Sequence, residues 1–130
     1  MILGVGTDLV RVDRIAQARR RHGERFLRRL FTPVEQAAGR GRADLDGFLA
    51  KRFAAKEALV KALGIGMRDG VWFTDMEVVN DPLGKPVMHC SGEVARRLEH
   101  LQARAHLSLT DEGGLAMAFV VLESVAQDAP

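Results

Sequence analysis

Apolar residues recur at helical spacing in the middle of the chain, and two charged residues interrupt the pattern. At about 100° per residue, segment 52–64 places Phe53, Glu57 and Val60 on one side of a helix, and Lys61 joins them. Burying an ionised carboxylate is costly unless it is paired or holds a metal ion. Glu57 therefore indicates either a salt bridge with Lys61, the ordinary outcome at this spacing, or a polar site on that face.

The first third of the chain shows clear boundaries for a strand and helices. A short strand is predicted over residues 2–7, and we expect Asp8 to end it and to cap the next helix. An amphipathic pattern then predicts helix over residues 9–30, with an interruption at Gly23. The segment Thr32-Pro33-Val34-Glu35 has the form of a capping box with proline at the first helical position, so a further short helix begins there.

The rest of the chain predicts one long helix, a hairpin, another helix and two strands. The helix around Glu57 is expected over residues 48–63, with Gly64 as its C-terminal cap. Strands are predicted at 71–79, 87–90, 106–110 and 115–122, with a turn at 80–86 and a helix capped by Ser91. This order predicts an α+β fold, with helices packed on a small, mainly antiparallel sheet. We expect a single domain over residues 1–124 and a frayed tail over 125–130.

Composition narrows the class of protein. The 130 residues are 47% hydrophobic, which suits one compact domain. The chain has neither an apolar run long enough for a bilayer nor the basic start of a secretory signal, so we expect a cytoplasmic protein without a membrane partner. Cys90 is the only cysteine, and the four histidines lack metal-ligand spacing, which excludes a disulfide framework and a zinc cluster.

Charge is unevenly distributed along the chain. The net charge is only +2, yet one segment carries the following arginines against Asp13 and Glu24 alone: Arg11, Arg14, Arg19, Arg20, Arg21, Arg25, Arg28 and Arg29. Such a stripe implies an acidic partner, whether a protein, a phosphate or a nucleic acid.

Asp8 and Glu57 are the two carboxylates whose positions in the sequence are least like those of ordinary solvent-exposed acidic residues. Two converging carboxylates, with waters and phosphate oxygens, are what Mg²⁺ usually binds. If they converge, Lys56, Lys61, Arg52 and the amides of Gly64-Ile65-Gly66 supply positive charge and donors for a polyphosphate.

Five segments resemble, in order and spacing, the bacterial holo-acyl-carrier-protein synthases, which are 4′-phosphopantetheinyl transferases. They are Gly4-Val5-Gly6-Thr7-Asp8-Leu9-Val10, Phe31-Thr32-Pro33-Val34-Glu35, Arg52 to Gly66, Asn80 to Pro86 and His106-Leu107-Ser108-Leu109. The resemblance implies Mg²⁺-dependent transfer of 4′-phosphopantetheine from coenzyme A to a serine of acyl carrier protein, with release of adenosine 3′,5′-bisphosphate. It also implies a homotrimer with active sites at the subunit interfaces.

The resemblance assigns roles to particular residues. Asp8 and Glu57 match the magnesium ligands, and Lys61, Arg52, Gly64 and Gly66 match positions that line the coenzyme A phosphates. The serine proton has two candidate acceptors, Glu57 and a metal-bound water.

One position departs from the family pattern. Asp111 stands where many members have a histidine, and a turn residue before Gly113-Gly114 is its simpler explanation. The acidic carrier fits the arginine stripe, so we expect Arg14, Arg21 and Arg25 to dock it.

Two alternatives remain open. A small basic nucleic-acid-binding module would use the arginine stripe, but the chain has one tryptophan and no tyrosine to stack on bases, and Glu57 stays unexplained. We therefore expect no nucleic-acid partner. The other alternative is a family member that binds coenzyme A without turnover.

Overall fold

A computed structural model describes residues 1–67 and 69–126. Its elements, in chain order, are β1 (Ile2–Arg11), α1 (Val12–His22), α2 (Glu24–Leu30), α3 (Pro33–Gly39), α4 (Leu45–Leu63), the 3-10 turn η1 (Phe73–Asp75), β2 (Met76–Asn80), β3 (Pro86–Cys90), α5 (Gly92–Leu101), β4 (Ala103–Glu112) and β5 (Leu115–Ser124). The predicted α+β class is confirmed, with antiparallel strands throughout the described sheets.

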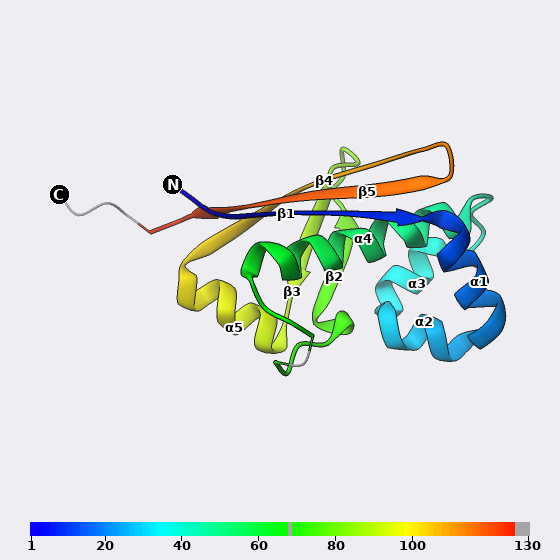
Figure 1. Ribbon diagram of the computed structural model, residues 1–130, viewed down its shortest axis with the longest axis horizontal. Helices are drawn as coiled ribbons and strands as arrows, with labels where there is room; N and C mark the ends of the chain where they lie inside the picture. Colours follow the sequence, from blue (N-terminus) through cyan, green and yellow to red (C-terminus); the bar gives the residue numbers. More distant parts are fainter. Residues whose placement is uncertain (68, 127–130) are drawn as a thin grey trace.

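The strands form two sheets, and the smaller one lies beside the β4 edge of the larger one. β1, β5 and β4 form a three-stranded sheet with β5 in the middle, and β2 pairs with β3 in a hairpin. α4 packs on all three strands of the larger sheet, and α1 to α3 gather near its N-terminal end (Figure 1). The two edges of the larger sheet, β1 and β4, are therefore both within reach of α4.

Small residues let α4 lie close to β1. A Cβ on Gly6 would overlap the carbonyl oxygen of Ala58, and one on Gly4 would overlap that of Ala62. Ala54, Ala58 and the neighbouring alanines of α4 are completely buried. The strand glycines thus mark a close approach of backbones, which fixes β1 and its Asp8 relative to α4.

The prediction for Asp8 is corrected by the structure. β1 continues through Asp8 to Arg11, which occupies the N-cap position of α1. Pairing of β1 with β5 extends from Ile2 to Arg11 because the 115–124 strand is equally long. Asp8 is therefore a strand residue, and its carboxylate is not engaged in capping.

The predicted buried stripe of α4 is also corrected. Phe53 and Glu57 are only half-buried and Lys61 is exposed, so these three residues form the least buried side of the helix. The core lies on the remaining faces, where Leu49, Leu59 and other apolar residues are buried, since α4 is surrounded by the sheet, the hairpin and the other helices.

Several predicted boundaries are confirmed. Thr32 accepts from the Glu35 amide, and the Glu35 carboxylate accepts from the Thr32 amide, which completes the capping box. Gly64 caps α4 in the left-handed conformation, and Gly23 separates α1 from α2. In the predicted tail, the Val125 amide donates to Gln102 O at 2.7 Å; residues 127–130 lie outside the described part.

The outer face of the larger sheet carries apolar side chains. Its exposed members on β1 and β5 are Leu3, Val5, Leu9, Leu115, Met117 and Phe119. None of the helices in the two described segments combines the length and the apolar character that a bilayer span requires.

Candidate functional site

The structure brings Asp8, Glu57 and Lys61 together where β1 meets the C-terminal half of α4. The Lys61 ammonium donates to Asp8 Oδ1 at 3.1 Å and to the carbonyl oxygen of Thr7 at 2.9 Å. Spacing on the helix places Glu57 one turn before Lys61, on the same side. The salt bridge of Lys61 is thus with Asp8, and the pair Glu57–Lys61, the simplest sequence interpretation, is not among the ion pairs of the described residues.

Glu57 lies in an environment with surplus negative charge. Its pKa is raised above the ordinary value, first because burial strips water from the carboxylate and second because Asp8 is nearby, while Lys61 and Arg14 oppose the shift. Two carboxylates that repel each other across one lysine have the donor chemistry that a divalent cation satisfies. Asp8 and Glu57 therefore fit Mg²⁺, although no cluster of three or more acidic, histidine or cysteine ligands occurs among residues 1–67 and 69–126.

Lys56 is not part of this group. Its side chain is fully buried, with the ammonium 2.6 Å from Glu35 Oε1 and a further hydrogen bond to the Leu30 carbonyl oxygen. The structure therefore gives no support to Lys56 as a phosphate contact.

Arg52 lies at a different cavity, of about 190 Å³, which it shares with Arg42, Lys51 and Phe48. The Arg52 guanidinium lies 3.8 Å from the Phe48 ring centroid and that of Arg42 lies 4.3 Å from it. Burial lowers the pKa of Arg52 to about 10, although the charge of Glu35 opposes the shift, and the positive charge of Arg42 adds a smaller contribution to the lowering. Its buried Nε has no hydrogen-bond partner among residues 1–67 and 69–126. These features suit an anion that would supply the missing acceptor.

The two glycines after α4 do not offer free donors. The Gly64 amide donates to the carbonyl oxygens of Lys61 and Val60, and the Gly66 amide donates to Asp69 Oδ2 at 3.0 Å. These glycines form the end of the helix, and their amides already donate hydrogen bonds within the chain.

The carboxylate group and the Arg52 cavity lie at opposite edges of the larger sheet. Asp8 belongs to the edge strand β1, whereas the Arg52 cavity includes Leu109 of the other edge strand, β4. A single protomer therefore does not bring Arg52 together with Asp8, Glu57 and Lys61.

The three predicted docking arginines are exposed. Arg14, Arg21 and Arg25 are absent from the ion pairs of the described part of the chain, and Arg14 is close enough to influence the pKa of Glu57. Arg19, from the same stripe, instead binds Asp46 of α4 through two hydrogen bonds of 2.7 and 3.1 Å. Arg19 thus makes a structural contact, whereas Arg14, Arg21 and Arg25 remain on an exposed basic surface. Arg14 lies at the side of this surface nearest the carboxylate pair.

Sequence reasoning missed Arg42, Phe48 and Lys51. Phe48 and Arg52 are one helical turn apart, a spacing that signals a stacked pair, but Arg42 precedes the helix and gives no periodic signal. Asp111, which departs from the family pattern, lies 3.3 Å from Lys51 at this cavity and has a specific partner. It lies at the end of β4, so the expected turn before Gly113 and Gly114 begins just beyond it.

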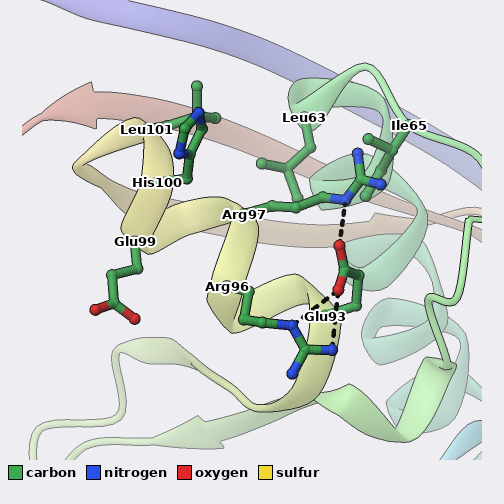
Figure 2. Close-up of a pocket in the computed structure, with 8 residues that line it drawn as sticks. All are labelled: Leu63, Ile65, Glu93, Arg96, Arg97, Glu99, His100 and Leu101. Atoms are coloured by element: carbon green, nitrogen blue, oxygen red, sulfur yellow. Dashed lines mark hydrogen bonds and ion pairs between the residues drawn. The ribbon is translucent and has the colours of Figure 1, made fainter.

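A larger cavity, of about 700 Å³, lies between the end of α4 and α5 (Figure 2). Glu93 bonds there to both Arg96 and Arg97, while Leu63 and Ile65 form the apolar side. Of the predicted site segments, only 64–66 reaches this cavity, through Ile65, and Asp8, Glu57, Lys61 and Arg52 do not line it. The size of the cavity alone therefore does not mark the site.

Comparison with known proteins agrees with the resemblance found in the motifs. Residues 4–120 match the family model of the 4′-phosphopantetheinyl transferase superfamily. A holo-[acyl-carrier-protein] synthase of Cereibacter sphaeroides is 50% identical over 135 aligned positions, covering 100% of this chain and 98% of the relative.

Solved structures of such synthases share the fold. The one from Neisseria meningitidis has a TM-score of 0.88 at 39% identity, covering 95% of this chain and 100% of that one. The one from Bacillus anthracis, in complex with CoA (3′,5′-ADP), has a TM-score of 0.80 at 37% identity, covering 95% and 98%. The chain belongs to the 4′-phosphopantetheinyl transferase superfamily and is an enzyme of that class.

Proposed function

We propose that this chain transfers the 4′-phosphopantetheine group of coenzyme A to a serine of an apo acyl carrier protein and releases adenosine 3′,5′-bisphosphate. The observation that carries the proposal is the carboxylate pair of Asp8 and Glu57 beside Lys61, bordered by an exposed basic helix. The names of the relatives and the coenzyme A complex of the Bacillus anthracis protein support the same substrates.

In this reaction the serine oxygen forms a bond to the phosphorus that carries pantetheine. The bond from that phosphorus to the bridging oxygen of adenosine 3′,5′-bisphosphate breaks, and the serine proton leaves. Mg²⁺, held by Asp8 and Glu57, would stabilise the charge on the leaving phosphate. Lys61 fixes the carboxylate of Asp8 through Oδ1. Because the metal would engage the carboxylate of Glu57 in this arrangement, the serine proton would pass to a water molecule at the site.

The Arg52 cavity is proposed to hold the phosphate at the adenosine end of coenzyme A. Arg42, Arg52 and Lys51 supply three positive charges, and the buried Nε of Arg52 lacks a partner within the described part of the chain. A phosphate bound there would satisfy this donor and would relieve the repulsion between the two arginines.

Because the two parts of the site lie at opposite sheet edges, we propose that they are joined between protomers of a homotrimer. A closed ring of protomers brings the β1 edge of one chain towards the β4 edge of the next. The exposed apolar face of the sheet, which includes Val5, Leu9 and Phe119, would be covered in the ring. Light scattering should give three times the mass of the chain, and Phe119→Asp should give monomers that lose transfer activity.

Intact-mass spectrometry tests the reaction itself. An apo acyl carrier protein mixed with coenzyme A, Mg²⁺ and this chain should gain the mass of one phosphopantetheine group. Glu57→Gln should abolish the gain while the circular dichroism spectrum stays unchanged. A folded wild-type protein that produces no mass gain refutes transfer, and full activity of Glu57→Gln removes that residue from the site.

A further inference from the structure

Trp72 has no role in the reaction proposed above, although it is the only tryptophan in the chain. Its side chain is 70% exposed. Single exposed apolar residues are common on protein surfaces, so exposure by itself assigns nothing. The surroundings of Trp72 are more informative.

The backbone at Trp72 is held in a defined conformation. Its amide donates to Asp75 Oδ2 at 3.3 Å, and its carbonyl oxygen accepts from the Asp75 amide at 3.0 Å. Asp75 in turn accepts, through its own carbonyl oxygen, from the Ser91 amide at 2.8 Å. The indole is therefore presented to solvent from a braced turn, which reduces the entropy lost when a partner covers it.

The turn that carries Trp72 adjoins the face with the carboxylate pair. Phe73, the next residue, stacks on Phe53 with ring centroids 5.7 Å apart and an interplanar angle of 30°. Phe53 lies one helical turn before Glu57 on the exposed side of α4. The turn η1 also packs against α2, which carries Arg25 (Figure 1). The turn that carries Trp72 thus lies between the Glu57 face and the basic helix α2.

We propose that Trp72 is the apolar anchor of the surface that docks the acidic carrier protein, with the arginines of α1 and α2 as its charged border. This inference rests on the proposed function, which requires a protein carrying a serine to approach Glu57. Protein interfaces concentrate binding energy in a few aromatic side chains, whereas charges at the border mainly raise the association rate. The arginines attract the carrier by charge, and Trp72 then retains it by burying its indole.

Steady-state kinetics of Trp72→Ala separate docking from chemistry. The KM for the carrier should rise roughly tenfold, in the range expected for an interface tryptophan. The KM for coenzyme A, and kcat at saturating carrier, should stay unchanged, and Trp72→Phe should recover most of the loss.

Leu83→Ala is the matched control. Leu83 is 95% exposed in the β2–β3 turn, at the opposite end of β2 from Trp72 (Figure 1), and its loss should leave the KM for the carrier unchanged. Ionic strength gives a second distinction. The effect of Arg21→Glu should shrink in high salt because exposed charges are screened, while the effect of Trp72→Ala should persist.

Fluorescence tests docking without relying on transfer, because Trp72 is the only indole in the chain. Adding an apo carrier that lacks tryptophan should shift the emission to shorter wavelength as the indole leaves water. A shift without any mass gain on the carrier supports docking while refuting transfer, so the two proposals fail separately. The inference is overturned by an unchanged emission spectrum, by an unchanged KM for the carrier in Trp72→Ala, or by a changed oligomeric mass of that variant, which would assign the indole to self-association.

Discussion

Lys56 Nζ lies 2.6 Å from Glu35 Oε1 with both side chains fully buried, although Glu57, the next residue along the same helix, is half-exposed. The other oxygen of Glu35 accepts from the Val78 amide at 2.9 Å. Burial lowers the pKa of Lys56, and the charge and hydrogen bond of Glu35 oppose that shift. One ion pair therefore joins α3, α4 and β2 in the core.

Removing only the lysine should be strongly destabilising. Lys56→Met leaves the Glu35 carboxylate buried without its counter-charge, and we expect the free energy of unfolding to fall by about 3–5 kcal/mol. The double variant Glu35→Gln with Lys56→Met should recover part of that loss, because no charge is buried and the single amide oxygen still accepts from one of the two backbone donors, Thr32 N or Val78 N. Urea denaturation measures both effects.

Lys51→Met is the matched control for this prediction. Lys51 pairs with Asp111 while both side chains remain partly exposed, so its loss should cost less than about 1 kcal/mol. Equal losses for Lys51→Met and Lys56→Met would contradict the special role of the buried pair.

Local signals allowed much of the fold to be predicted from the sequence. The capping box at Thr32 and the terminal Gly64 depend on residues a few positions apart, and both are confirmed. The phase of α4 was wrong because periodicity assumes one buried face, whereas this helix is buried on most sides. The end of β1 was wrong because the length of an edge strand depends on its partner, which lies more than 100 residues away at Phe119 and its neighbours.

The site was predictable where single residues conflicted with their surroundings. Glu57 conflicted with an apolar pattern, and the structure places it in the same group as Asp8. The role of Lys56 was not predictable, because its partner Glu35 lies on another helix and only the tertiary fold buries them together. Arg42 and Lys51 looked like ordinary surface charges, since only the tertiary fold places them with Arg52.

Gly6 should not tolerate a side chain. In Gly6→Ala the new Cβ would overlap the Ala58 carbonyl oxygen, a backbone atom that cannot rotate away. β1 must then separate from α4, and we expect a loss of more than about 3 kcal/mol in unfolding free energy together with weaker Mg²⁺ binding, because Asp8 moves with the strand. Thr7→Ala changes the adjacent exposed position and should have little effect in the same thermal unfolding and metal titration. A stable Gly6→Ala protein would show that the helix can move away.

Asp111 should weaken anion binding at the Arg52 cavity. Its carboxylate pairs with Lys51 at 3.3 Å and so competes with a bound phosphate for that charge. Asp111→Asn should tighten binding of adenosine 3′,5′-bisphosphate by roughly two- to fivefold at low salt, a size typical of a partly exposed charge. Calorimetric titration measures this, and the effect should vanish in a Lys51→Met background. An equal gain in that background would mean that Asp111 acts independently of Lys51.

Ionisation of Glu57 should lower the free energy of unfolding. Its folded-state pKa is raised, so the penalty is absent below the ordinary glutamate pKa of about 4.3, appears as the pH rises above it and is fully present above the raised folded-state value. Glu57→Gln should therefore be more stable than wild type at neutral pH, by about 0.5 kcal/mol after allowance for screening of this half-exposed group. At pH 4 or lower the difference should disappear. Mg²⁺ should raise the melting temperature of wild type and leave that of Glu57→Gln unchanged.

The affinity for Mg²⁺ should depend on pH through the same carboxylate. The metal and the proton compete for Glu57, so the affinity falls as the pH drops through the raised pKa. This fall, the acid limb of the pH profile, should therefore lie at a higher pH than an ordinary glutamate would give. Arg14 lowers this pKa by its charge. In Arg14→Ala the limb should therefore move to higher pH, by less than about one unit because water screens the interaction. Metal titration without carrier protein, from pH 4 to 8, isolates this effect from docking. Arg28→Ala is the control, because Arg28 is another exposed arginine of the same stripe but is not among the causes of this pKa shift. It should leave the acid limb in place. An equal shift in both variants would mean that net charge alone moves the limb.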